Sequence, residues 1–173
     1  MLHSLIRSSL PVVAAALALA ALPSPAAEVT YRVDLSGAQN VPDPIKTPAS
    51  GTLELKVSPN GQSVSYVLTV KDIANVAEGD IHLGPADANG PLVVKLYHAG
   101  TPKKGPYSGV LAEGRFTAAD LLGSMKGSPL SDLLEMFADG SAYVNVHTND
   151  GMDPPNSGPG DYRLGEIRGQ IKP

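Results

Sequence analysis

Six residues with chemically versatile polar side chains occur in three pairs, and the members of each pair are two positions apart. The pairs are Asp80 and His82, Asn145 and His147, and Glu166 and Arg168. In a β-strand, side chains at positions i and i+2 point to the same side, so each pair would share one face of its strand. If the three strands are neighbours in one sheet, the pairs form a single patch of imidazole, carboxylate, amide and guanidinium groups.

One chemistry that such a patch supports is transition-metal binding. Neutral imidazoles from His82 and His147 would supply two nitrogen ligands, and the carboxylate of either Asp80 or Glu166 would add oxygen. Zn²⁺ and Cu²⁺ both accept this combination of ligands. Arg168 opposes the interpretation, because its permanent positive charge repels a cation unless a carboxylate neutralises it. A Cu or Zn site is therefore one hypothesis for the patch.

Two other interpretations of the same residues stay open. The pairs can be the solvated faces of antiparallel strands whose other side packs into the core, and surface ion pairs of this kind contribute only ~0–1 kcal/mol. Alternatively, the patch can bind a small ligand or an extracytoplasmic protein, and Asn145, Arg168 and His98 are then the candidate contacts. The sequence alone does not choose among these three interpretations.

The sequence contains no local signature of catalysis. It has no Gly-x-Ser-x-Gly elbow, no phosphate-binding loop with Lys and no His-Glu-x-x-His helix. It also has no Cys, which excludes thiol chemistry, Cys-ligated zinc and iron–sulfur clusters. The Asp- and Asn-containing segments 87–90 and 149–153 lack the spacing of an EF-hand calcium loop and are typical of turns. These observations favour a protein that is not an enzyme.

The first 27 residues have the organisation of a secretory signal peptide. Arg7 precedes an apolar run from Leu10 to Leu22, and small residues follow up to Ala27. The run is shorter than the roughly 20 residues that span a bilayer. We therefore expect cleavage after Ala26 or Ala27, which leaves residues 28–173 as one exported domain, periplasmic or extracellular, without an integral membrane segment.

The charge of the mature chain argues against nucleic acid as a partner. The whole sequence has a net charge of −4, from 13 Lys and Arg against 17 Asp and Glu. Cleavage would remove only Arg7, so 12 basic residues remain against 17 acidic ones and the net charge becomes −5. Phosphate-backbone binding needs a basic stripe, and the only local concentration of basic residues is Lys103 with Lys104.

The pattern of apolar residues and turn residues predicts an all-β domain. Alternating or short apolar runs bounded by Gly, Pro, Asn and Ser are typical of strands. Eight such strands are expected, at residues 31–35, 53–57, 63–71, 80–83, 92–97, 109–116, 141–147 and 164–172. Two short helices are expected, one beginning at Thr117 and one running from Pro129 to about Ala138. Together these elements predict an antiparallel β-sandwich or Greek-key barrel of about eight strands.

The second of these helices shows one apolar face. Leu130, Leu133, Leu134 and Phe137 recur at the spacing i, i+3, i+4 and i+7, which places them on one side of a helix. This stripe is expected to pack against the sheet. The connections at residues 36–50, 98–108 and 149–163 are expected to be long loops.

Seven segments, in order along the predicted mature chain, resemble the CHRD domain, which is named after its repeats in chordin. They are Leu35–Pro42, Thr47–Gly51, Asp80–His82, Asn89–Val94, Phe116–Leu121, Tyr143–Thr148 and Gly165–Gln170. The resemblance implies an extracytoplasmic β domain, here a bacterial-type, single-domain exported member; in chordin such domains belong to a secreted antagonist of growth-factor signalling. The family usually has a His-x-His pair where this chain has Asp80-Ile81-His82. We therefore expect a non-catalytic binding or structural module, with metal binding as the alternative.

Overall fold

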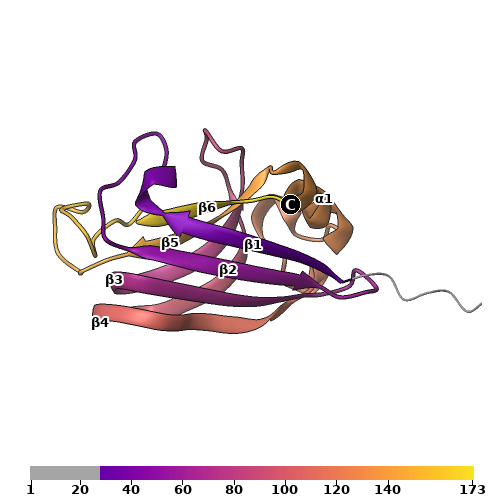
Figure 1. Ribbon diagram of the computed structural model, residues 1–173, viewed down its shortest axis with the longest axis horizontal. Coiled ribbons are helices and arrows are strands. Elements are labelled where there is room, and N and C mark those ends of the chain that lie inside the picture. The colour runs from indigo at the N-terminus through magenta and orange to yellow at the C-terminus, as the bar shows by residue number, and fades with distance from the viewer. Residues whose placement is uncertain (1–27) are drawn as a thin grey trace, which may run out of the picture.

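The computed structural model describes residues 28–173 and contains one antiparallel sheet of six strands (Figure 1). The strands are β1 (Val29–Ser36), β2 (Ser50–Val57), β3 (Val64–Leu83), β4 (Leu92–Phe116), β5 (Ala142–Thr148) and β6 (Ile167–Ile171). The all-β prediction is confirmed. The predicted signal peptide lies outside the described residues.

The sheet closes into a barrel because β3 pairs with β2 as well as with β5. The strand order is β2-β1-β6-β5-β3-β4, and β2 also pairs with β3. The five strands β2, β1, β6, β5 and β3 therefore form a ring, and β4 adds to β3 as a sixth strand. The ring closes between β1 and β6 at the pair Ser36 and Arg168.

β3 pairs with different strands along its length. Its residues 64–71 pair with β2, its residues 76–83 pair with β5, and β4 follows it from Val64 to His82. The predicted strands 63–71 and 80–83 are thus one strand, and so are 92–97 and 109–116. This merging reduces the expected eight strands to six, and the expected loop 98–108 is part of β4.

The sequence pattern does not predict the full length of β3 and β4, because these strands contain bulges. The register between β3 and β4 shifts at several points between Leu68 and His82, and Asp72 and Asn75 adopt positive φ values of 53° and 52°. A bulge places an extra residue in one strand and so interrupts the period-2 alternation that identifies strands. Residues 72–79 therefore lack the pattern although they are paired.

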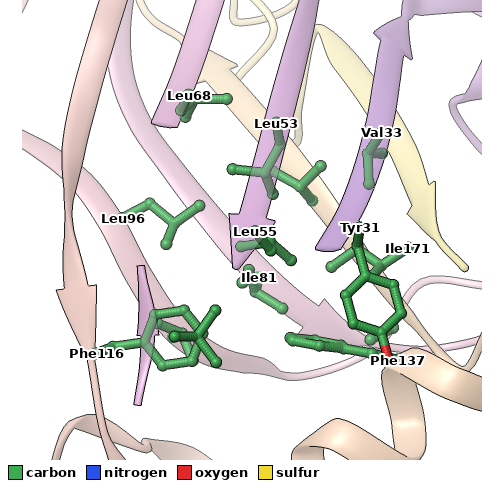
Figure 2. Packing of buried hydrophobic residues seen from close by; sticks show 14 of the residues in the cluster. Tyr31, Val33, Leu53, Leu55, Leu68, Ile81, Leu96, Phe116, Phe137 and Ile171 are labelled. Carbon is green, nitrogen blue, oxygen red and sulfur yellow. The ribbon is translucent and has the colours of Figure 1, made fainter. Parts of the chain in front are cut away.

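Alternating side chains of the strands fill the barrel. In β1, Tyr31, Val33 and Leu35 are buried while Arg32 and Asp34 between them are exposed, as the alternation predicts. Figure 2 shows side chains from β1, β2 and β3 converging with Phe137 of the helix α1 (Leu130–Asp139). The rings of Tyr31 and Phe137 meet edge to face, with centroids 5.6 Å apart, a favourable aromatic geometry.

The helix α1 and two of the three 3₁₀ turns lie in the connection between β4 and β5, and the third turn follows β1. The predicted start at Thr117 is a 3₁₀ turn, η2 (Ala118–Asp120), with a capping box between Thr117 and Asp120; two further turns are η1 (Gly37–Gln39) and η3 (Gly123–Met125). α1 ends at Gly140, whose φ of 75° is the left-handed conformation that glycine favours. Leu130, Leu133 and Phe137 of its apolar stripe are buried and Leu134 is partly buried.

No helix within residues 28–173 has the length and apolar character needed to cross a membrane.

Candidate metal centre

Strand pairing brings the polar residues of β3, β5 and β6 into adjacent rows. Asp80 pairs with Asn145, which pairs with Arg168 on its other side. His82 pairs with Tyr143, and Glu78 pairs with His147. The residues between them, including Ile81, Val144 and Val146, are fully buried in the apolar core. The polar residues therefore share the opposite face of the sheet, as the i, i+2 argument requires.

Two loops cover this face. The β3–β4 loop spans residues 84–91 and the β5–β6 loop spans residues 149–166. Their backbone carbonyl groups contact both histidines: His82 Nδ1 lies 3.1 Å from the oxygen of Gly90, and His147 Nδ1 lies 3.0 Å from the oxygen of Arg163. Each imidazole is thus held by its Nδ1 atom.

These two hydrogen bonds determine which ring nitrogen carries the proton. A carbonyl oxygen can only accept a hydrogen bond, so Nδ1 must be the donor in both rings. In the neutral imidazole, Nε2 is then unprotonated and has a free lone pair. A second ring nitrogen bonded to a backbone carbonyl is the usual arrangement of a metal-ligating histidine, because it fixes the tautomer and the ring orientation.

The rings are also fixed by stacking. His82 lies parallel to Tyr143, with centroids 5.1 Å apart and an interplanar angle of 12°. The centroids of His82 and His147 are 5.9 Å apart. His147 is the more accessible member of its pair with Asp80: 15% of its side chain is exposed, against 1% for Asp80.

The atoms that face the centre of the cluster have no hydrogen-bond partner among the described residues. They are Asp80 Oδ1 and Oδ2, His82 Nε2 and His147 Nε2, and each is buried; Asn145 Oδ1 is also buried without a partner. An unsatisfied buried polar atom costs about 1–3 kcal/mol, and such atoms are rare in folded proteins. Four of them in one cluster favour a site for a group that supplies the missing interactions.

The ionisation behaviour of Asp80 follows from its burial. Removal from water raises its pKa from 3.8 to about 7; nearby Glu78 adds to this effect, whereas Lys95 opposes it. A cation bound beside the carboxylate would reverse this shift, because the charged form would then be the stabilised one.

Burial acts on the two histidines in the opposite sense. It lowers the pKa of His82 and of His147 below 6.5, although the hydrogen bonds to Gly90 and Arg163 oppose this. Both rings are therefore neutral at pH 7, which is the form that binds metals. Neighbouring charges contribute less: Arg168 further lowers the pKa of His82, and Glu78 raises the pKa of both rings.

The spacing of Asp80, His82 and His147 is close to that of a metal site. One ligand atom from each residue lies within 4.8 Å of the others, and His147 Nε2 is 3.8 Å from Asp80 Oδ2. Ligands at 2.0–2.1 Å around a tetrahedral ion are roughly 3.3 Å apart. Small side-chain movements would therefore close the three groups around one ion. Three protein ligands would leave a tetrahedral ion with an open position.

Glu166 is not part of this group. Its carboxylate accepts hydrogen bonds from Thr47 Oγ1 at 2.5 Å, Thr148 Oγ1 at 2.7 Å and the Gly160 amide at 2.8 Å. The residue is buried, and these three donors satisfy it. Glu166 directly precedes β6. Its hydrogen bonds to Thr148 and Gly160 fix the 149–166 loop to the end of β5.

The remaining predicted residues surround the centre without entering it. Asn145 is buried, and its amide nitrogen donates to the Leu164 carbonyl at 3.2 Å. Arg168 is buried with its guanidinium 3.8 Å from the Tyr143 ring centroid. His98 is exposed on β4, where its Nδ1 lies 3.1 Å from Glu78 Oε1. Glu78 thus lies between His98 and the cluster.

Three features of the centre have no signal in the sequence. The stacking partner Tyr143 is on the expected face of β5, but its position opposite His82 depends on the register. The carbonyl groups of Gly90 and Arg163 belong to loops, and any residue type supplies a carbonyl. Gly165 is glycine for a steric reason. A Cβ atom at this position would collide with the amide group of Asn145, so only glycine fits there.

Comparison with known proteins gives one match. The family model described as the CHRD domain matches residues 31–155, which include most of β1, all of β2 to β5 and all three residues of the cluster. No curated protein and no solved structure matches the chain.

Proposed function

This chain belongs to the CHRD domain family, and we propose that it is an exported, non-catalytic binding module whose ligand is a single transition-metal ion, Cu²⁺ or Zn²⁺. The proposed ligands are His82 Nε2, His147 Nε2 and a carboxylate oxygen of Asp80.

One observation carries this proposal. Both histidines have their Nδ1 atoms bonded to backbone carbonyls, and their Nε2 atoms are buried without a partner beside an equally unpartnered carboxylate. A solvated strand face would not leave these atoms buried, and a structural histidine usually has its nitrogens satisfied. A divalent cation would satisfy all three groups, because each imidazole presents a lone pair and a bound cation favours the ionised form of Asp80, which presents lone pairs as well.

The charge of the site suits a divalent ion. The three proposed ligands, two neutral imidazoles and one carboxylate, carry a total charge of −1, which offsets half of the charge of a divalent ion. Glu78 adds a second negative charge nearby. The Arg168 guanidinium donates to the carbonyl groups of Pro85 and Ala88. Its hydrogen bonds are thus directed at the 84–91 loop rather than at the proposed ligands.

The test is metal binding by the purified chain 28–173 after removal of metal with a chelator. Calorimetric titration with Cu²⁺ and separately with Zn²⁺ should show one ion per chain. His82→Gln, His147→Gln and Asp80→Asn should each weaken binding by at least about tenfold, equivalent to 1.4 kcal/mol. His98→Gln is the matched control: it is the third histidine of the described residues and lies outside the cluster, so its binding should equal that of the unmodified chain.

The result against the proposal is equally specific. Absence of stoichiometric binding, or binding that persists in a His82→Gln/His147→Gln double variant, would identify the cluster as a metal-free structural feature of the family fold. Nitrogen hyperfine structure from two imidazoles in the spectrum of the Cu²⁺ form would support it independently.

Export is part of the same proposal and rests on the signal-like sequence of residues 1–27. Its test is intact-mass analysis of protein from the exported fraction, which should begin at Ala27 or Glu28. Protein that retains residues 1–27 in that fraction would contradict it.

A further inference from the structure

A second feature of the domain, which shares no proposed ligand with the metal centre, is a buried cation without a directly paired anion. Arg168 is 1% exposed. No carboxylate oxygen of residues 28–173 lies within 4.0 Å of its guanidinium. Arginine remains protonated in proteins, and a buried charge that is not paired is costly. Its contact with the Tyr143 ring recovers only part of that cost.

The hydrogen bonds of this guanidinium are unevenly distributed. Nη2 donates to the carbonyl groups of Pro85 at 2.8 Å and Ala88 at 3.1 Å, and to Gln170 Oε1 at 3.3 Å. Nη1 has one contact, to Asn89 Oδ1 at 3.5 Å, which is longer than an ordinary hydrogen bond. One nitrogen is therefore saturated by the loop, and the other retains donor capacity.

Arg168 lines a cavity of about 250 Å³ next to this loop. The cavity lies between the chain that follows β1 and the 84–91 loop, and its other lining residues are Ala38, Gln39, Asn40, Val41, Pro42, Pro44, Ala86 and Gln170. Apart from Arg168, none of these residues is charged. The cavity thus combines one buried cation with a mostly small and apolar wall, as expected of a site that orients a small ligand by one polar group.

We propose that this cavity binds a small organic carboxylate, with the carboxylate group paired to the Arg168 guanidinium and a short apolar body against Val41, Pro42 and Pro44. The carboxylate would supply a directly paired counter-charge, because the anionic neighbour Asp87 acts on Arg168 only from beyond ion-pair distance. Charge-assisted hydrogen bonds to a guanidinium are among the strong ones in proteins. The site uses none of the proposed metal ligands.

The test compares benzoate with benzamide, which has nearly the same shape and no charge. Titrations of isotope-labelled chain 28–173 are followed by nuclear magnetic resonance in the presence of a chelator, so that the outcome is independent of the metal proposal. Benzoate should shift the side-chain signals of Arg168 and Gln170 in a saturable way. Benzamide should bind at least about tenfold more weakly.

Two kinds of variant locate the site. Arg168→Lys keeps the charge but loses the planar fork of donors, and should weaken benzoate binding at least about tenfold. Because Arg168 also holds the 84–91 loop, Ala86→Phe provides a variant that leaves the guanidinium in place and fills the cavity from its exposed rim; it should block binding while the spectrum remains that of a folded chain. Arg32→Met is the control, since Arg32 is exposed and already paired with Glu54 at 3.2 Å.

Three results would overturn the proposal: no saturable shift with benzoate, equal affinity for benzoate and benzamide, or unchanged benzoate binding in Ala86→Phe. Equal weakening by Arg32→Met would likewise show nonspecific attraction to positive charge rather than a site.

Discussion

At the scale of single residues, the proposed centre depends on which polar atoms of each side chain remain without a hydrogen-bond partner. His82 and His147 each use Nδ1 for a backbone carbonyl and leave Nε2 free. Neither oxygen of Asp80 lies within hydrogen-bond distance of a donor among the described residues, and its neighbours include the Glu78 carboxyl group. The metal-free protein therefore keeps a carboxylate buried at an energetic cost, which a cation would remove.

This cost predicts a pH dependence of stability in the metal-free protein. Below about pH 4, Asp80 is protonated in both the folded and the unfolded chain. Between the unfolded pKa of 3.8 and the folded pKa of about 7, the unfolded chain releases a proton that the folded chain retains, so this residue's contribution to stability falls as pH rises. Above pH 7 the contribution of Asp80 to the free energy of unfolding falls no further. Its total decrease is at most about 4 kcal/mol, since one pKa unit corresponds to 1.36 kcal/mol.

Asp80→Asn should abolish this fall, because the amide does not ionise. In denaturant unfolding with a chelator present, the variant should gain stability relative to the unmodified chain as pH rises from 4.5 to 8. His82 and His147 act oppositely, since their lowered pKa values reduce stability as pH falls below 6.5, but they contribute equally to both proteins. A difference that does not change with pH would contradict the account.

The sequence was sufficient to pair Asp80 with His82 on one face and to place His147 on the polar face of its own strand. It was not sufficient to separate Asp80 from Glu166 as the carboxylate of the cluster. That distinction depends on the fold of the 149–166 loop, which brings Thr148 and Gly160 to Glu166. Loop conformations of this length have no periodic pattern from which they could be predicted.

At the scale of elements, regular strands and the helix followed from the sequence, and irregular strands did not. β1 and β2 alternate strictly between buried and exposed or partly exposed residues over most of their length. β3 and β4 continue through bulges and positive-φ residues that resemble turn signals. Strand continuity there depends on pairing with a neighbouring strand, and that information is not local in sequence.

The helix α1 gives a prediction at this scale. Leu133 is fully buried, so Leu133→Ala should reduce the free energy of unfolding by ~2–5 kcal/mol, the loss expected for a cavity in a packed core. Leu134→Ala, at a partly buried position of the same stripe, should cost less. Denaturant unfolding of both variants measures the difference. A loss below about 0.5 kcal/mol for Leu133→Ala, typical of surface positions, would mean that α1 does not pack on the barrel.

At the scale of the whole molecule, the pairing of β3 with β5 is what assembles the centre. Asp80 and His82 lie on the half of β3 that pairs with β5, and His147 lies on β5 itself. The two loops that orient the histidines follow directly from these strands. A metal ion at this position would link two strands and, through the histidines, both loops.

This linkage predicts a metal-dependent thermal stability. An ion that binds only the folded chain stabilises it by about 2.7 kcal/mol at a free concentration of 100 times Kd, which corresponds to roughly 5–11 °C in Tm for a domain of this size. Calorimetric scans with Zn²⁺ should show this increase in the unmodified chain and in His98→Gln. An equal increase in His82→Gln would mean that the stabilising ion binds elsewhere.

The most direct measurement is a crystal structure of the Zn²⁺-loaded chain with anomalous scattering data at the zinc edge. We expect one strong peak, at about 2.0–2.1 Å from His82 Nε2 and His147 Nε2 and about 2.0–2.2 Å from an Asp80 oxygen. Both Nδ1 atoms should still be bonded to the carbonyl groups of Gly90 and Arg163. A peak bound through Nδ1, a peak at Glu166 or His98, or no peak within the cluster would contradict the central claim.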